Sequence, residues 1–228
     1  MSLVGAPSAP IPVVVTHRSL VAAVLVPAAT IVVVLGLAIL PLLTPVVLHP
    51  LLTTGEAHLW LGVPPAVAHA ASDATVADLV LGGAFAVLAP DGTRFYAADE
   101  IAHLRDARLL LWLLLGAAAV AALALVTRLA RARDRAATWR GIARGGAIAA
   151  LATIVIGVIG LLAFDPLFEL FHRVFFPGGN WAFDPGTSRL VRLYPYAFWQ
   201  LAATGLGVGV VILGTLAWVA GRRLGRAA

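Results

Sequence analysis

Four stretches of the sequence are apolar over a length that matches the hydrocarbon core of a bilayer. A helix needs about 20 predominantly apolar residues to cross that core. The four stretches are residues 19–43, 109–126, 145–164 and 197–220. Hydrophobic residues make up 61% of the chain and charged residues only 12%, so a water-facing surface cannot cover the apolar side chains. The sequence therefore predicts an all-α, polytopic membrane protein with four transmembrane helices.

The first apolar run is longer than the apolar region of a signal peptide, and the A-x-A sequence at residues 68–70 lies far downstream of it. We therefore interpret the run as a retained first helix. No change of composition divides the chain, which predicts one membrane domain over residues 1–228. The connecting segments 44–108 and 165–196 should form a small mixed region on the outer face, and residues 127–144 a loop on the other face.

The arginines predict how the chain is oriented. All 16 basic residues are Arg, and the loop 127–144 contains six of them against one acid, Asp134. By the positive-inside rule this loop and the Arg-containing C-terminal end lie in the cytoplasm. Four spans then put the N-terminal end, with Arg18, there too, as in a multi-pass protein of a bacterial plasma membrane. The net charge of +5 therefore reflects orientation and not nucleic-acid binding.

The patterns between the spans predict several local structures. Residues 73–81 indicate a short helix capped by Asp73, and residues 90–92 (Pro-Asp-Gly) a hairpin turn. From Asp99 a helical pattern continues into the second span. Asp165-Pro166 predicts an N-cap and first-turn proline, followed by an amphipathic helix in the interface. The glycines at positions 205, 207 and 209 predict a close helix contact.

Aromatic residues predict the depth of the chain in the membrane. Trp112 and Trp199 mark the outer interface, and Trp139 and Trp218 the inner one, because indole rings prefer the headgroup level. A further group before span four is interpreted mainly as part of the same aromatic belt. Its members are Trp181, Phe183, Tyr194, Tyr196, Phe198 and Trp199.

Two histidines are the candidate acid–base groups. His103 lies six residues before Leu109, about 9 Å at the helical rise, and His172 lies a comparable distance beyond Phe164. Both are expected at the depth of the outer-leaflet ester groups. An isolated interfacial histidine is more often an indifferent polar residue, but two at one depth favour a shared function. His49, His58 and His69 have no comparable context and are interpreted as loop residues.

Three carboxylates are the expected orienting groups of this pair. Glu100 and Asp106 share a helix face with His103, and Glu169 lies one turn before His172.

The residues around these histidines resemble the lipoprotein intramolecular transacylases, a family of four-span bacterial membrane proteins that produce lyso-form lipoproteins. The matching motifs are Glu100-Ile-Ala-His103-Leu-Arg-Asp106, Phe171-His172-Arg-Val-Phe175-Phe176, Trp181-Ala-Phe183-Asp184-Pro185 and Leu193-Tyr-Pro195 with Phe198. In topology the resemblance covers most of the chain, whereas residues 44–88 align with nothing in the family.

The resemblance implies an acyltransferase. Its substrate would be a diacylglyceryl-modified lipoprotein, whose sn-2 acyl chain moves onto the α-amine of the same N-terminal cysteine. His103 and His172 would be the catalytic residues, with no metal or other cofactor, and membrane lipid would be the surroundings of the site. The expected substrate contacts are Arg105, Arg173, Asn180 and Trp181.

The chemistry of these residue types suits the implied reaction. Aminolysis of an ester needs a base for the amine proton, stabilisation of an oxyanion and an acid for the leaving alkoxide. The substrate amine is itself the nucleophile, so the protein needs none. This agrees with a sequence that contains no Cys and no G-x-S-x-G motif.

Other classes of function remain open from the sequence. The pair Glu100-x-x-His103 and Glu169-x-x-His172 is similar to the motifs of di-iron bundles, although such sites need two further Glu residues from other helices. A transporter is disfavoured because the span centres have no charged residues. A lipid- or lipoprotein-binding membrane protein without catalysis would share every feature above.

Overall fold

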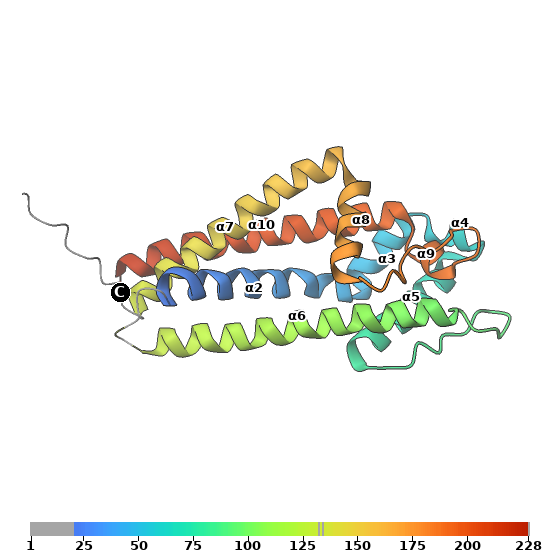
Figure 1. Cartoon of the computed structure of the whole chain (residues 1–228), viewed down its shortest axis with the longest axis horizontal. Coiled ribbons are helices and arrows are strands. Elements are labelled where there is room, and N and C mark those ends of the chain that lie inside the picture. Colours follow the sequence, from blue (N-terminus) through green and yellow to red (C-terminus); the bar gives the residue numbers. More distant parts are fainter. Residues whose placement is uncertain (1–20, 132, 134, 228) are drawn as a thin grey trace, which may run out of the picture.

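The computed structural model describes residues 21–131, 133 and 135–227 (Figure 1). Ser19 and Arg18, at the predicted start of the first span, lie outside the described residues, as does Asp134. In chain order the elements are a π-helix η1 (Val21–Leu25), α2 (Val26–Ile39), a 3₁₀-helix η2 (Leu40–Leu43), α3 (Pro45–Thr54), α4 (Ala57–Leu61), α5 (Pro65–Leu81), α6 (Ala98–Ala130), α7 (Arg135–Leu162), α8 (Phe164–Phe175), α9 (Arg189–Leu193) and α10 (Tyr196–Ala227).

Four helical segments are long and apolar enough to cross a bilayer: Ala23–Leu43, Ala98–Ala130, Arg135–Leu162 and Tyr196–Ala227. They confirm the all-α membrane fold with four transmembrane helices. Three of the four extend well past the predicted spans, because no helix-breaking residue separates the spans from their flanks. The Arg-rich segment 127–144 is accordingly not a loop for most of its length, since α6 runs to Ala130 and α7 starts at Arg135.

The long helices form an elongated bundle in which α7 leaves α10 toward one end (Figure 1). The two helices meet closely at Gly146 and Gly214. A Cβ atom added to Gly146 would lie 2.4 Å from the Gly214 carbonyl oxygen, so only glycine permits this approach. The close contact predicted at residues 205–209 is found in part: a Cβ on Gly209 would lie 3.5 Å from the Ala38 Cβ of α2, and one on Gly207 would lie 3.6 Å from the Thr153 Cγ2 of α7. A Cβ on Gly205 would meet nothing within 4 Å.

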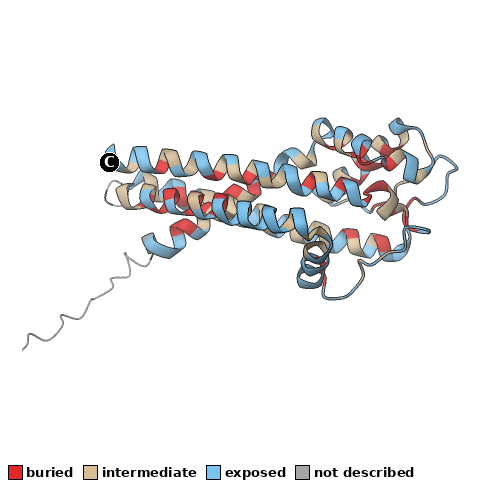
Figure 2. Ribbon diagram, turned by 90° about the horizontal axis from the view of Figure 1, so that it is seen from above, coloured by how far each residue is buried: buried red, intermediate tan, exposed pale blue. Residues whose placement is uncertain are grey.

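The sides of the bundle are apolar and exposed. Val120, Leu123 and Leu151 are 70%, 65% and 64% exposed. Buried residues occur along the inside of the bundle and in the folded region at one end (Figure 2). Large apolar side chains exposed in this number are disfavoured in water and are accommodated by lipid tails. The surface therefore fits a bilayer, as the four spans require.

One end of the bundle has a folded region, which we name the head region (residues 44–97 and 164–195). Its core includes Leu52, Phe85 and Leu193, all at most 1% exposed. Buried hydroxyl groups pair within it, as in the 2.6 Å hydrogen bond between Thr75 and Tyr96. The segment 44–97 is therefore a packed structure above the bundle.

Several local predictions are corrected or confirmed in the head region. Helix α5 begins at Pro65, so Asp73 is in mid-helix and is not a cap. Helix α8 begins at Phe164, which puts Asp165 in the first turn and not at the N-cap. The hairpin turn is confirmed by the 2.9 Å bond from the Gly92 N–H to the Ala89 carbonyl. Its strands are reduced to one bridge among the described residues.

Candidate active site

The two predicted histidines lie against each other, although 68 residues separate them in the sequence. His103 is in the first turns of α6, and His172 is in α8, which runs across the end of the bundle (Figure 1). Their ring centroids are 6.1 Å apart, with planes 26° from parallel. The two imidazoles are therefore close enough to act on one small substrate group.

The hydrogen bonding of His172 defines which ring nitrogen is free. Its Nδ1 lies 2.7 Å from the Phe168 carbonyl oxygen. A carbonyl only accepts, so Nδ1 is the protonated nitrogen and Nε2 has the lone pair. The side chain is 7% exposed, and this burial lowers the pKa of His172 against the opposing effect of the Phe168 carbonyl. At neutral pH the imidazole is therefore uncharged and able to accept a proton at Nε2.

The Nδ1 atom of His103 is buried and has no hydrogen-bond partner among the described residues. Leaving a buried polar atom unpaired costs about 1–3 kcal/mol. A substrate donor or acceptor placed here would remove that cost. An unsatisfied polar atom of this kind is typical of sites that bind a ligand or perform chemistry.

Aromatic rings enclose the histidine pair. Phe176 lies 4.6 Å from the His103 ring centroid, and Phe183 lies 5.8 Å from it. Phe168 and Trp181 lie 4.2 Å and 5.0 Å from the His172 ring. Trp181 and Phe183 thus lie beside the histidine pair, as predicted for Trp181, whereas Phe183 was interpreted only as part of the aromatic belt. The spacing Phe168–His172–Phe176, one helical turn at each step, is the signal that could have found the other two rings.

The predicted role of Glu100 as an orienting group is not supported. Its side chain is 3% exposed and accepts hydrogen bonds from the Ser188 hydroxyl, the Leu190 N–H and the Ala97 N–H. It therefore fastens the start of α9 to the start of α6 and does not bond to His103. The sequence separation of Ser188 and Glu100 hid this contact from the motif analysis.

The other two carboxylates also bond elsewhere. Glu169 forms a 2.6 Å ion pair with Arg173 on the exposed side of α8. Asp106 accepts a 2.8 Å hydrogen bond from the Asn180 side-chain amide, which ties α6 to the loop that contains Trp181 and Phe183. Asp106 thus contacts the neighbouring loop, and no hydrogen bond joins it to His103.

The structure divides the four predicted substrate-contact residues. Trp181 packs on His172. Asn180, which precedes Trp181 in the sequence, donates a hydrogen bond to Asp106. Arg173 is engaged by Glu169. Arg105 is exposed on α6, and among the described residues no hydrogen bond or ring contact joins it to either imidazole. Asn180 and Trp181 are therefore the two members of this group that lie beside the pair.

A second histidine cluster in the head region was missed. His49 on α3 and His69 on α5 stack with centroids 4.2 Å apart, and the His49 Nε2 lies 2.9 Å from the Asp73 carboxylate. Burial and the neighbouring His49 lower the pKa of His69. The interpretation of both histidines as loop residues without a carboxylate was wrong, because folding joins His49 to residues 20 and 24 positions further along the chain.

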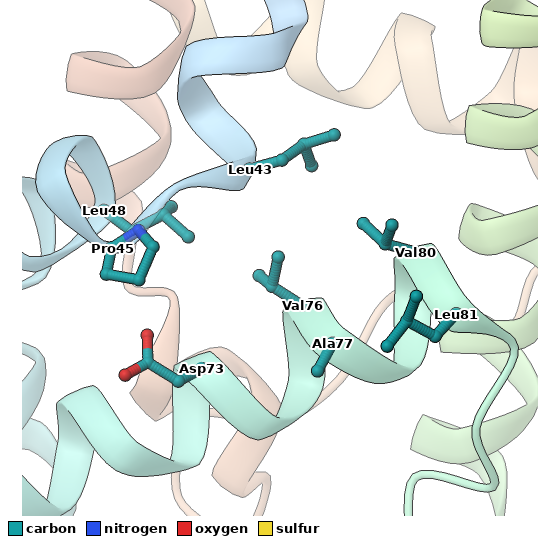
Figure 3. Close-up of a pocket in the computed structure, with 8 residues that line it drawn as sticks. All are labelled: Leu43, Pro45, Leu48, Asp73, Val76, Ala77, Val80 and Leu81. Atoms are coloured by element: carbon teal, nitrogen blue, oxygen red, sulfur yellow. The ribbon is translucent and has the colours of Figure 1, made fainter.

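The Asp73 carboxylate lies at the edge of a hollow of about 310 Å³ between η2, α3 and α5 (Figure 3). The rest of the lining is apolar and includes Leu43, Leu48, Val76 and Val80. Neither His103 nor His172 lines it. The hollow is therefore separate from the candidate active site.

The paired Glu-x-x-His motifs do not converge as a di-iron site requires. Glu100 faces Ser188, and Glu169 faces Arg173, so the two histidines are left without carboxylate ligands. Within residues 21–131, 133 and 135–227 no group of three His, Asp or Glu side chains is placed to hold a metal ion.

A four-span bundle with two adjacent imidazoles in an aromatic enclosure at one end is a polytopic membrane protein equipped for acid–base chemistry. The sequence model of one family, described as "Lipoprotein intramolecular transacylase Lit", matches residues 83–199, which include both histidines. The chain belongs to the lipoprotein intramolecular transacylase family.

Solved structures show the same fold. The membrane-integral lipoprotein intramolecular transacylase Lit from Bacillus cereus matches with a TM-score of 0.78 at 15% identity, over 92% of this chain and 96% of that chain. A variant of that protein with a histidine replaced by alanine matches with a TM-score of 0.63, also at 15% identity, over 92% of this chain and 94% of that chain. The sequence matches none of the curated proteins with which it was compared.

Proposed function

We propose that this chain is an intramolecular transacylase that moves the sn-2 acyl chain of a diacylglyceryl lipoprotein onto the α-amine of the same N-terminal cysteine. Membership of the transacylase family supports the activity. The observation that supports the site most directly is the contact between His103 and His172, whose centroids are 6.1 Å apart. The second candidate, a metal-dependent enzyme, is disfavoured because both Glu side chains of its motifs bond elsewhere.

The proposed reaction balances without a protein nucleophile. The amine nitrogen attacks the carbonyl carbon of the ester, and the bond from that carbon to the sn-2 oxygen breaks. His172, neutral and with Nε2 free, suits the acceptance of the proton that the amine loses. The His172 imidazolium can then deliver the same proton to the leaving alkoxide, while a ring N–H of His103 stabilises the oxyanion by a hydrogen bond. The products are an amide and a hydroxyl, and both imidazoles end neutral.

The aromatic enclosure has a chemical role in this proposal. Water that reached the ester would release a free fatty acid in place of the amide. Phe168, Phe176 and Trp181 cover His172, which is only 7% exposed. An apolar wall of this kind disfavours water and also suits an acyl chain. The substrate amine, delivered by the same molecule, is then the nucleophile at the highest local concentration.

The activity is tested with a purified protein and a synthetic diacylglyceryl lipopeptide. Because the transfer is intramolecular, the product is an isomer and the intact mass of the lipopeptide stays the same. Fragmentation should instead show one acyl group moved from the glyceryl part to the N-terminal amine. Loss of an acyl mass would indicate a hydrolase. Stable binding without isomerisation would indicate a non-catalytic lipoprotein-binding protein.

We also propose that the head region is on the outer face of the membrane and that the N- and C-terminal ends of the chain are cytoplasmic. The Arg residues at the opposite end support this orientation. Reporter fusions after Arg135 and Arg226 should report cytoplasm, and one near Asp91, in the head region, should report the outside. A cytoplasmic signal at Asp91 would contradict the orientation and the access of the site to outer-leaflet substrates.

A further inference from the structure

A second hollow, of about 350 Å³, lies between α7 and α10. It is formed where α7 starts and α10 ends, at the opposite end of the bundle from α8 and the histidine pair (Figure 1). Its lining residues are Arg140, Ala143, Gly221, Arg222, Gly225 and Arg226. Three cationic side chains and three small residues therefore share one concave surface, with no acidic residue in the lining.

The glycines make the floor of this hollow. A Cβ atom added to Gly221 would lie 2.6 Å from both the Ala143 nitrogen and the Trp139 oxygen. One added to Gly225 would lie 3.1 Å from the Trp139 Cβ. Any larger residue would push α10 away from α7 or occupy the space. The close approach of the two backbones therefore leaves the arginine side chains as the only long groups around the hollow.

The charge of the hollow is uncompensated within the described part of the chain. No carboxylate forms an ion pair with Arg140, Arg222 or Arg226 among those residues. Arg222 instead lies over the Trp218 ring, 5.4 Å from its centroid. Three guanidinium groups that repel one another are held together, which favours binding of an anion. The planar, multidentate guanidinium group matches the geometry of a phosphate.

The surroundings of the hollow place it at the depth of lipid headgroups. Trp139 packs against Gly225 in the floor, and Trp218 contacts Arg222. Indole rings of membrane proteins concentrate at the boundary between hydrocarbon and water. Basic pockets between transmembrane helices at this depth are suited to the phosphates of anionic lipids. A lipid phosphate is held there by the bilayer itself, whereas a free ion must be recruited from solution.

We propose that the hollow formed by Arg140, Arg222, Arg226 and the glycine floor binds the phosphodiester headgroup of an anionic phospholipid. This site is distinct from the histidine pair and does not depend on the acyl-transfer reaction. The bound lipid would join α7 to α10 at the end of the bundle opposite the head region.

The test uses the full-length protein purified in a zwitterionic detergent and titrated with phosphatidylglycerol or phosphatidylcholine, with bound lipid counted by native mass spectrometry. The variant R140Q/R222Q removes two charges from the hollow. The matched control, R131Q/R223Q, removes two charges from exposed arginines that do not line it. A melting curve without added lipid establishes that each variant is folded, and the single variants R222Q and R223Q replace the doubles where a double is unfolded.

The wild type and the control are expected to retain phosphatidylglycerol in preference to phosphatidylcholine, and R140Q/R222Q to bind it on the order of 30-fold more weakly, at about a factor of five for each arginine. Inorganic phosphate at the same concentration should not displace the lipid. Equal weakening in the two double variants would overturn the proposal, because it would indicate a general surface attraction. Absence of a preference in the wild type, or displacement by inorganic phosphate, would overturn it as well.

Discussion

Replacing either His103 or His172 with Gln is expected to lower the rate of acyl transfer by about 10² to 10⁴. Gln retains a polar side chain of similar size but cannot take up and release a proton near neutral pH. The residual rate should come from the substrate itself, whose amine and ester are already in one molecule. The measurement is the rate of appearance of the N-acyl fragment ions from the diacylglyceryl lipopeptide.

The matched control for this experiment is H49Q/H69Q. These two histidines also stack, with centroids 4.2 Å apart, and are also in the head region. They should retain activity within a few-fold because neither contacts the His103–His172 pair. A melting curve must accompany the His172 variant, since this side chain is buried against Phe168, Phe176 and Trp181.

Two outcomes would contradict the assignment of the site. One is wild-type turnover in both H103Q and H172Q. The other is an equal loss of activity in H49Q/H69Q, which would indicate that the stacked pair on α3 and α5 performs the chemistry. In addition, no acyl-enzyme should be detected by mass spectrometry of the protein during turnover, because the acyl group passes directly from oxygen to nitrogen.

The transmembrane helices could be predicted because their signal is local. An apolar run of about 20 residues has few structural alternatives, and the second span was recognised from its own sequence. The depth expected for His103 and His172 likewise rests on local positions, namely their distances from the ends of two apolar runs. That α8 turns back across the bundle and brings the two rings together is a consequence of packing between α6 and α8, which depth alone does not specify.

The contacts that the sequence did not reveal are those between distant segments. Asp73 was predicted as a helix cap from its neighbours, yet it pairs with His49 on another helix. The glycines at positions 205–209 have a known interface spacing, but the sequence does not show that Gly209 faces Ala38 of α2 while Gly205 faces no neighbour. The neighbours of Phe183 in the sequence do not show that it packs on His103, because that contact forms only when the loop is folded over α6. In each case the local sequence suggests a role for the residue, whereas the partner that it contacts depends on tertiary packing.

Replacing Glu100, at the start of α6, with Ala is expected to cause a large loss of stability. The carboxylate is 3% exposed and accepts bonds from three donors, the hydroxyl of Ser188 and the N–H groups of Leu190 and Ala97. Alanine would leave all three donors without this acceptor, and each unsatisfied buried donor costs about 1–3 kcal/mol. We therefore expect the free energy of unfolding to fall by about 3 kcal/mol or more.

The control for this prediction is E169A, which removes an exposed carboxylate paired only with Arg173 and should change stability by about 0.5 kcal/mol or less. Hydrogen exchange gives a local readout, because the Leu190 amide loses its acceptor in E100A and should exchange faster. In E100Q the remaining carbonyl oxygen can still accept from Ser188 and Leu190, so stability should be partly restored.

A melting temperature of E100A equal to that of E169A, with unchanged exchange at Leu190, would show that the link between α6 and α9 is unimportant. If instead E100A is destabilised while E100Q retains acyl transfer, Glu100 acts by holding α9 and not by exchanging protons with His103, which is the role that its three donors imply.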